Sequence, residues 1–171
     1  MEIIIDGYNL LMVLFGQSLG SNWEQARLRL LKQLDGYRAY RQHEITVVFD
    51  GWKSGWMMES SELYGNIKII YSRQGEKADE VIKRLAYRRN GSPLVITSDR
   101  EIIRAVEQAG AHTLSSAEFA GKLQTVSYPM GNDKDRYDDD DDDRPIGARK
   151  KGNPRRLPKK ERQRRQRLDK L

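Results

Sequence analysis

The sequence contains no cysteine and only two histidines among 171 residues. The absence of cysteine excludes disulfide bonds and thiolate metal sites. His43 directly precedes an expected strand and His112 lies on a weak one, which favours structural roles for both. A zinc site or a histidine general base is therefore not expected. No apolar stretch reaches the roughly 20 residues that cross a bilayer.

Several phosphate-binding and nucleophile motifs are also missing. There is no Gly-x-Gly-x-x-Gly, no Gly-x-x-x-x-Gly-Lys-Ser/Thr and no Gly-x-Ser-x-Gly. These absences argue against a dinucleotide-binding fold, a P-loop and a serine hydrolase. Met1 leads directly into an apolar run with no basic segment and no cleavage site, so no signal peptide and a cytoplasmic location are expected.

Charge is distributed unevenly along the chain, although its net value is only +6. Residues 1–125 hold 16 basic and 15 acidic side chains, residues 126–143 hold 2 and 8, and residues 144–171 hold 13 and 2. A segment of this composition cannot bury enough apolar surface to offset the entropy lost on ordering. We predict a folded domain over residues 1–127 and a disordered, acidic-then-basic tail over residues 128–171.

Apolar runs predict five strands, at residues 2–5, 45–49, 67–71, 94–97 and 112–114. Helical patterns between them are expected to begin at the capping boxes headed by Ser21 and Ser98, after Gly75, and, for a last short helix, at Ser115. Strands that alternate with helices predict an α/β fold, with a mainly parallel sheet covered on both faces. Residues 51–66 lack clear periodicity and are expected to form a long loop or contain a short helix.

Three aspartates follow apolar strand runs, namely Asp6, Asp50 and Asp99, and Asp79 lies in the first turn of the helix after the third strand. The carboxyl ends of parallel strands meet at one edge of a sheet, where ligands bind. Carboxylates gathered there repel one another unless a cation lies between them, and hard divalent cations prefer oxygen ligands. The pattern therefore predicts a metal-dependent site for a phosphate-containing substrate.

Each of these acidic residues alone has a simpler explanation. Asp6 and Asp50 stand in sequences typical of turns, and Asp79 and the neighbouring Glu80 are stabilised by the helix dipole. Asp99 is expected at the first helical position, free to point at the sheet edge, because Ser98 already fits the capping box. The occurrence of four carboxylates at one edge is what favours a metal-dependent site over these simpler explanations. Glu80 is a weaker candidate for this site.

The motifs around these residues resemble the NYN domain family, and more closely its YacP-like branch in the PIN-like ribonuclease group. They are Asp6-Gly7-Tyr8-Asn9-Leu10-Leu11, Val47-Val48-Phe49-Asp50-Gly51, Gly75-Glu76-Lys77-Ala78-Asp79-Glu80-Val81-Ile82 and Thr97-Ser98-Asp99-Arg100. The resemblance covers about residues 1–125. It implies a PIN-like three-layer sandwich with a five-stranded sheet. It also implies an endoribonuclease that uses Mg²⁺ or Mn²⁺, one branch of which acts on messenger RNA at the ribosome.

The resemblance also implies site residues. The metal ligands would be Asp6, Asp50, Asp79 and Asp99, and the catalytic set would be Asp6, Asn9, Asp79 and Asp99. Asn9 would orient a phosphate or hold its loop, and Gly7 would let the backbone approach a ligand. Some branch members have alanine where Gly51 stands, a difference expected to affect only the loop.

RNA contacts are expected from side chains that flank the predicted edge, namely Lys53, Arg73, Lys77, Arg100 and Trp52. Trp52 and Trp56 could stack on bases or anchor their loop against the core. The basic tail could bind RNA phosphates or serve only as a solvated extension. The acidic cluster favours an endoribonuclease over a non-catalytic RNA- or ribosome-binding module, and the tail argues against a phosphatase acting on small molecules. Carboxylate–metal chemistry alone does not distinguish RNA from DNA.

Overall fold

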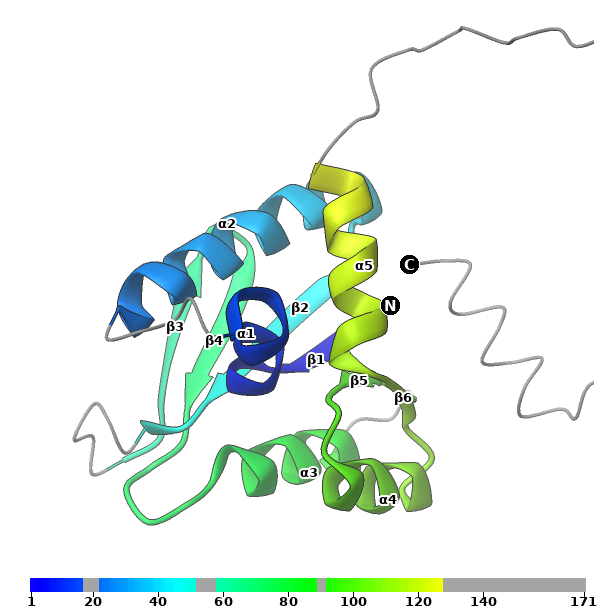
Figure 1. Ribbon diagram of the computed structural model, residues 1–171. Helices are drawn as coiled ribbons and strands as arrows, with labels where there is room; N and C mark the ends of the chain where they lie inside the picture. The colour runs from blue at the N-terminus through cyan, green and yellow to red at the C-terminus, as the bar shows by residue number, and fades with distance from the viewer. Residues whose placement is uncertain (17–21, 52–57, 89–91, 128–171) are drawn as a thin grey trace, which may run out of the picture. The chain divides into compact units, whose positions relative to one another are not determined.

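The computed structural model describes residues 1–16, 22–51, 58–88 and 92–127 (Figure 1). Five helices and six strands follow one another in these ranges. They are β1 (Glu2–Asp6), α1 (Gly7–Phe15), α2 (Trp23–Arg41), β2 (Glu44–Phe49), β3 (Ser60–Tyr64), β4 (Ile67–Tyr71), α3 (Ala78–Arg88), β5 (Leu94–Ile96), α4 (Arg100–Gln108), β6 (His112–Leu114) and α5 (Ser116–Ser127). None of the helices in these ranges is long and apolar enough to cross a membrane.

The strands form one sheet in the order β3-β4-β2-β1-β5-β6. Every neighbouring pair is parallel except β3 and β4, which are antiparallel. The sheet has six strands rather than the five expected, because β3 forms within the stretch predicted to be a loop. It is an edge strand whose residues are mostly exposed, so no apolar run or alternation marks it in the sequence.

Strand β1 lies at the centre of the sheet, between β2 and β5. Its residues Ile3, Ile4 and Ile5 have no exposed surface. A strand that is buried on both faces requires an apolar run rather than an alternating pattern, which is the sequence seen here.

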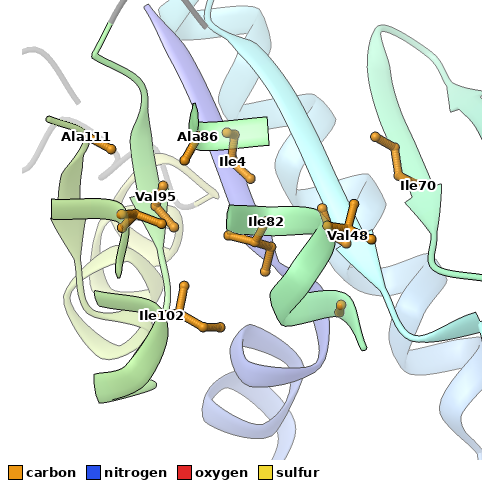
Figure 2. Close-up of a cluster of buried hydrophobic side chains, with 11 residues drawn as sticks. Ile4, Val48, Ile70, Ile82, Ala86, Val95, Ile102 and Ala111 are labelled. Carbon is orange, nitrogen blue, oxygen red and sulfur yellow. The ribbon is translucent and has the colours of Figure 1, made fainter. Parts of the chain in front are cut away.

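Helices cover both faces of the sheet, which gives the predicted three layers (Figure 1). On one face, α3 and α4 pack on the strands through a cluster of buried aliphatic side chains that includes Ile4, Val48, Ile82, Val95 and Ile102 (Figure 2). On the other face, α5 contacts α1 and α2. The buried rings of Tyr37 and Phe119 meet there edge to face, with centroids 5.5 Å apart.

The starts of α1 and α2 differ from the expectations, whereas α5 begins directly after Ser115, as expected. Helix α1 begins directly after β1, where a turn was a plausible alternative, because Asp6 caps it. Helix α2 is preceded by Asn22, whose side chain makes no capping bond; Ser21 lies outside the described residues. Helix α5 has 12 residues and is longer than expected, and Ser115 and Glu118 exchange hydrogen bonds at its start.

Candidate active site at the carboxyl edge of the sheet

Four neighbouring strands direct acidic residues to one edge of the sheet. Asp6 ends β1, and Asp50 directly follows β2. Asp79 lies in the first turn of α3, after β4, and Asp99 precedes α4, after β5. Strands β4, β2, β1 and β5 are adjacent and parallel, so their carboxyl ends lie side by side. The structure therefore brings together the four aspartates that the sequence singled out.

Asp6 is the most buried of these carboxylates, with 8% of its surface exposed. Its Oδ1 accepts a hydrogen bond from Asn9 N, and its Oδ2 accepts one from Thr97 Oγ1, each at 3.1 Å. Burial raises the pKa of Asp6 to about 6, and the charges of Asp79 and Asp50 add to the rise, while the two hydrogen bonds oppose it. Ionisation of Asp6 in the folded protein therefore costs free energy.

Asp79 is subject to the same repulsion. Burial raises its pKa first, followed by the charges of Asp99 and Asp50, whereas Lys83 and Lys77 lower it. Within the described part of the chain, its carboxylate has no hydrogen bond or ion pair. In addition to burial, the charges of Asp79 and Asp50 raise the pKa of Asp6, and the charges of Asp99 and Asp50 raise the pKa of Asp79, so the four aspartates lie in one electrostatic cluster.

Asp50 and Asp99 also support the backbone. Asp50 Oδ1 accepts a hydrogen bond of 2.6 Å from Ala78 N, which ties the end of β2 to the start of α3. Asp99 is the N-cap of α4, since its Oδ1 accepts from the backbone nitrogens of Glu101 and Ile102. The prediction that Ser98 caps this helix, with Asp99 at the first helical position, is wrong.

Asn9 joins three segments at the same edge. Its Oδ1 accepts hydrogen bonds from Ser98 N at 3.1 Å and from Ser116 Oγ at 2.7 Å. A backbone N–H can only donate, so the oxygen of the amide must face Ser98. Asn9 lies in the first turn of α1 rather than in the expected loop, and it ties this helix to Ser98 and to the start of α5. Its Nδ2 makes no hydrogen bond with the residues that the structure describes, and can still donate to a substrate.

Thr97 was not anticipated as part of this site. It is fully buried, and its hydroxyl donates to Asp6 while accepting from Asp99 N at 3.1 Å. One hydroxyl therefore connects two of the four aspartates. The pattern that could have indicated it is a polar residue directly after the apolar run of β5.

The two glycines next to the aspartates are required by close packing. A Cβ at Gly7 would lie 2.3 Å from the ring of Phe49, so protein atoms, rather than a ligand, occupy the space beside it. A Cβ at Gly51 would lie 1.8 Å from the carbonyl oxygen of Ser72, whose Oγ accepts a hydrogen bond from Gly51 N. Alanine at position 51 therefore does not fit this chain without backbone movement, and the effect is not confined to the loop.

The expected RNA-binding residues are only partly described. Arg73 is exposed and pairs with Glu76 at 3.3 Å, and both Lys77 and Arg100 are exposed at the starts of α3 and α4. Lys53, Trp52, Trp56 and the segment 128–171 lie outside the described residues.

The two histidines lie away from the four aspartates. His43 is buried, with its ring centroid 6.2 Å from that of Tyr37. His112 is half-buried in β6, and its backbone N donates to Pro93 O. These positions agree with the structural roles expected for both.

The donor atoms at this edge suit a hard cation, since all four side chains offer carboxylate oxygens. The described residues nevertheless include no group of three or more acidic or histidine side chains arranged to hold a metal ion. Asp6, Asp50 and Asp99 are each oriented by their own capping or cross-strand hydrogen bond. Metal binding by these residues stays a prediction.

Comparison with known proteins identifies the family to which this chain belongs. The family model of the YacP-like NYN domain matches residues 3–168. The chain belongs to the YacP-like NYN domain family. This domain is of the PIN-like nuclease type, so its function is RNA-related. The match extends through the acidic and basic segments, and the expectation that the family pattern ends near residue 125 is therefore wrong.

Relatives of this YacP-like domain include the protein YacP of Bacillus subtilis, which is 26% identical over 129 residues, 72% of this chain and 75% of the relative. The crystal structure of Rae1 (YacP) from Bacillus subtilis is similar, with a TM-score of 0.61 and 26% identity over 74% of this chain and 75% of that one. A mutant form of the same protein gives a TM-score of 0.63 and 27% identity, over 74% and 76% of the two chains. These similarities confirm the predicted fold class.

Proposed function

We propose that this YacP-like NYN domain is a metal-dependent endoribonuclease that hydrolyses phosphodiester bonds in RNA, with Mg²⁺ or Mn²⁺ as cofactor. The observation that supports it most is the electrostatic coupling of Asp6, Asp50, Asp79 and Asp99 at one sheet edge. Burial and the charges of neighbouring aspartates raise the pKa values of Asp6 and Asp79, which is costly in a purely structural role, and a bound cation would relieve that cost.

In this proposal the four aspartates would hold the cation, and the cation would supply positive charge to the scissile phosphate and lower the pKa of a water. Asp79 is the residue most available for this role, because no described contact occupies its carboxylate. Asn9 Nδ2 donates to a phosphate oxygen, while its Oδ1 keeps the start of α1 in place. Lys77 and Arg100, exposed at the same edge, offset the charge of the RNA strand.

The C-terminal segment supplies a further RNA contact in this proposal. Residues 1–125 are nearly neutral and residues 144–171 have a net charge of +11, so the segment provides most of the attraction for phosphates. Ribosome-associated or messenger RNA is the proposed substrate class. Replacing Arg162, Arg164, Arg165 and Arg167 with glutamine should reduce the slope of log affinity against log salt by about 3 if all four contact a single strand. An unchanged slope would refute this role.

The deciding experiment is cleavage of a labelled single-stranded RNA by the full chain with Mn²⁺ or Mg²⁺. We expect cleavage to be lost in EDTA and in Asp79→Asn, and retained in Asp35→Asn, a matched control on α2 away from the carboxyl edge. Full activity of a correctly folded Asp79→Asn protein would refute the mechanism. The same assay on DNA and on mononucleotides tests whether RNA is the substrate.

The second candidate is a non-catalytic RNA- or ribosome-binding module. It is favoured by the finding that Asp6, Asp50 and Asp99 are each already hydrogen-bonded within the protein. Calorimetric titration with Mn²⁺ separates the two candidates. The nuclease requires binding that weakens in Asp79→Asn, whereas the binding module predicts RNA affinity that is independent of the metal.

A further inference from the structure

Two partly exposed aromatic side chains lie next to the carboxylate edge. Tyr8 follows Asp6 by two residues at the start of α1, and Trp23 is the first residue of α2. Their ring centroids are 5.5 Å apart, and the rings meet edge to face at 76°. Trp23 was not among the aromatic residues that the sequence suggested for stacking.

Phe49 and Tyr71 form a second, more deeply buried aromatic layer against this pair. Phe49 and Tyr71 are stacked, with ring centroids 6.0 Å apart and 23° between their planes, and are 1% and 7% exposed. Tyr8 contacts Phe49 edge to face at 5.4 Å. The inner layer fills the core, so the outer layer of Tyr8 and Trp23 reaches solvent as a surface supported from below.

Arg27 adds a positive charge to this surface. It lies one helical turn after Trp23, and its guanidinium carbon is 5.5 Å from the centroid of the Tyr71 ring. Among the residues that the structure describes, no carboxylate forms an ion pair with Arg27. In this it differs from Arg73 and Arg84, which pair with glutamates. Its charge remains available to a ligand.

The aromatic surface and the acidic cluster are in electrostatic contact. Burial raises the pKa of Tyr8, the charge of Asp50 raises it further, and the charge of Arg27 lowers it. Tyr8 is thus near enough to both charged groups to respond to them. Tyr8 also contacts Phe49, which directly precedes Asp50, so a strand whose phosphate lies at the aspartates would pass beside the aromatic surface.

We propose that Tyr8, Trp23 and Arg27 form a nucleotide subsite, in which the base beside the scissile phosphate stacks on the Tyr8 ring, the nearly perpendicular Trp23 ring borders the edge of that base, and Arg27 pairs with a flanking phosphate. The subsite rests on the proposed function, because it positions the strand that the aspartates would cleave. Aromatic side chains and arginine are the groups that hold unpaired bases and their phosphates. A base held in this way cannot remain paired and stacked within a duplex, so the subsite selects single-stranded RNA.

The test uses the full chain in EDTA, so that binding is measured without cleavage. The ligands are a short single-stranded RNA and a set of its copies, each with one abasic nucleotide at a different position. The variants are Tyr8→Leu, Tyr8→Phe and Arg27→Gln. The matched controls are Tyr40→Leu and Arg29→Gln, exposed positions on α2.

We expect Tyr8→Leu to weaken binding of the intact RNA about 5- to 150-fold, the range measured for stacked bases, and Tyr8→Phe to retain it. The abasic copy that lacks the stacked base should bind wild type more weakly than the other copies do. Tyr8→Leu, in contrast, should bind this abasic copy and the intact RNA with the same affinity. A destabilised fold would weaken every copy equally, so this position dependence is specific to stacking.

Two results would overturn the subsite. The first is that Tyr8→Leu and Arg27→Gln bind the intact RNA as tightly as the two control variants do. The second is that the same abasic copy still binds more weakly than the intact RNA when the protein is Tyr8→Leu. If wild type cleaves RNA with Mn²⁺ while either result holds, the subsite alone is wrong. If wild type neither binds nor cleaves single-stranded RNA, the proposed function fails and the subsite fails with it.

Discussion

Replacing Asp6 with asparagine should make the metal-free protein more stable at neutral pH while it removes activity. Asp6 is 8% exposed, and its pKa is raised from 3.8 to about 6 in the folded state. An acid whose pKa is higher when folded binds protons more tightly in the native state. The folded protein therefore loses stability as the pH rises from about 4 to about 6.

The size of this effect follows from the shift of the pKa. Each pKa unit corresponds to about 1.4 kcal/mol, so a shift of about two units lowers the free energy of unfolding by about 3 kcal/mol above pH 6. Asparagine avoids that loss, but it cannot accept from the Thr97 hydroxyl as Oδ2 does, which costs about 1 kcal/mol. We expect Asp6→Asn to be less stable than wild type by about 1 kcal/mol near pH 4 and more stable by about 2 kcal/mol near pH 7.5.

Urea unfolding of both proteins in EDTA, at intervals from pH 4 to pH 8, measures this difference directly. Groups that titrate alike in both proteins cancel, so the change of the difference with pH reports Asp6 and its coupling to Asp50 and Asp79. A difference in the free energy of unfolding that stays constant across this range would refute the reasoning. Added Mn²⁺ should stabilise wild type and leave Asp6→Asn nearly unchanged if Asp6 is a ligand.

Two further predictions concern residues that support the aspartates. Gly51→Ala should lower the free energy of unfolding by about 1–3 kcal/mol and slow cleavage, because the new Cβ meets the Ser72 carbonyl oxygen beside Asp50. Gly36→Ala, on α2 with nothing within 4 Å of the new Cβ, should leave stability unchanged or raise it by up to about 1 kcal/mol in the same thermal unfolding assay. Asn9→Ala should destabilise the protein by about 2 kcal/mol in urea, since two donors lose their acceptor; a loss below about 0.5 kcal/mol would contradict this role.

Much of the fold could be predicted because its central strands are buried on both faces. Ile3, Ile4 and Ile5 form an apolar run with no exposed surface, and such runs are visible without any structural information. Strand β3 could not be found in this way. It pairs only with β4, and its partner rather than its own side chains determines that it is extended.

The candidate site was predictable in its charges and less so in its hydrogen bonds. Asp6, Asp50 and Asp99 stand at strand ends and Asp79 at the start of the helix after β4, and parallel pairing then determines which edge they share. Which residue caps α4 depends on a backbone geometry that two neighbouring residues, Ser98 and Asp99, could each satisfy. The role of Thr97 was hidden for a related reason, because its partner Asp6 is distant in sequence and is brought near only by the pairing of β1 with β5.

The hydrogen bonds of Asn9 and Asp6 have a consequence for the order in which the domain is assembled. Asn9 bonds to Ser116, 107 positions later, and Asp6 bonds to Thr97, 91 positions later. During synthesis the N-terminal residues are made first, so β1 can pair with β2 and β4 can join them well before these later partners exist. The last of these contacts, from the Ser116 hydroxyl to Asn9, forms only when the start of α5 has been made. A nascent or truncated chain that ends before residue 116 can therefore make the hydrogen bonds of Asp6, Asp50 and Asp99 but lacks the bond that ties Asn9 to α5.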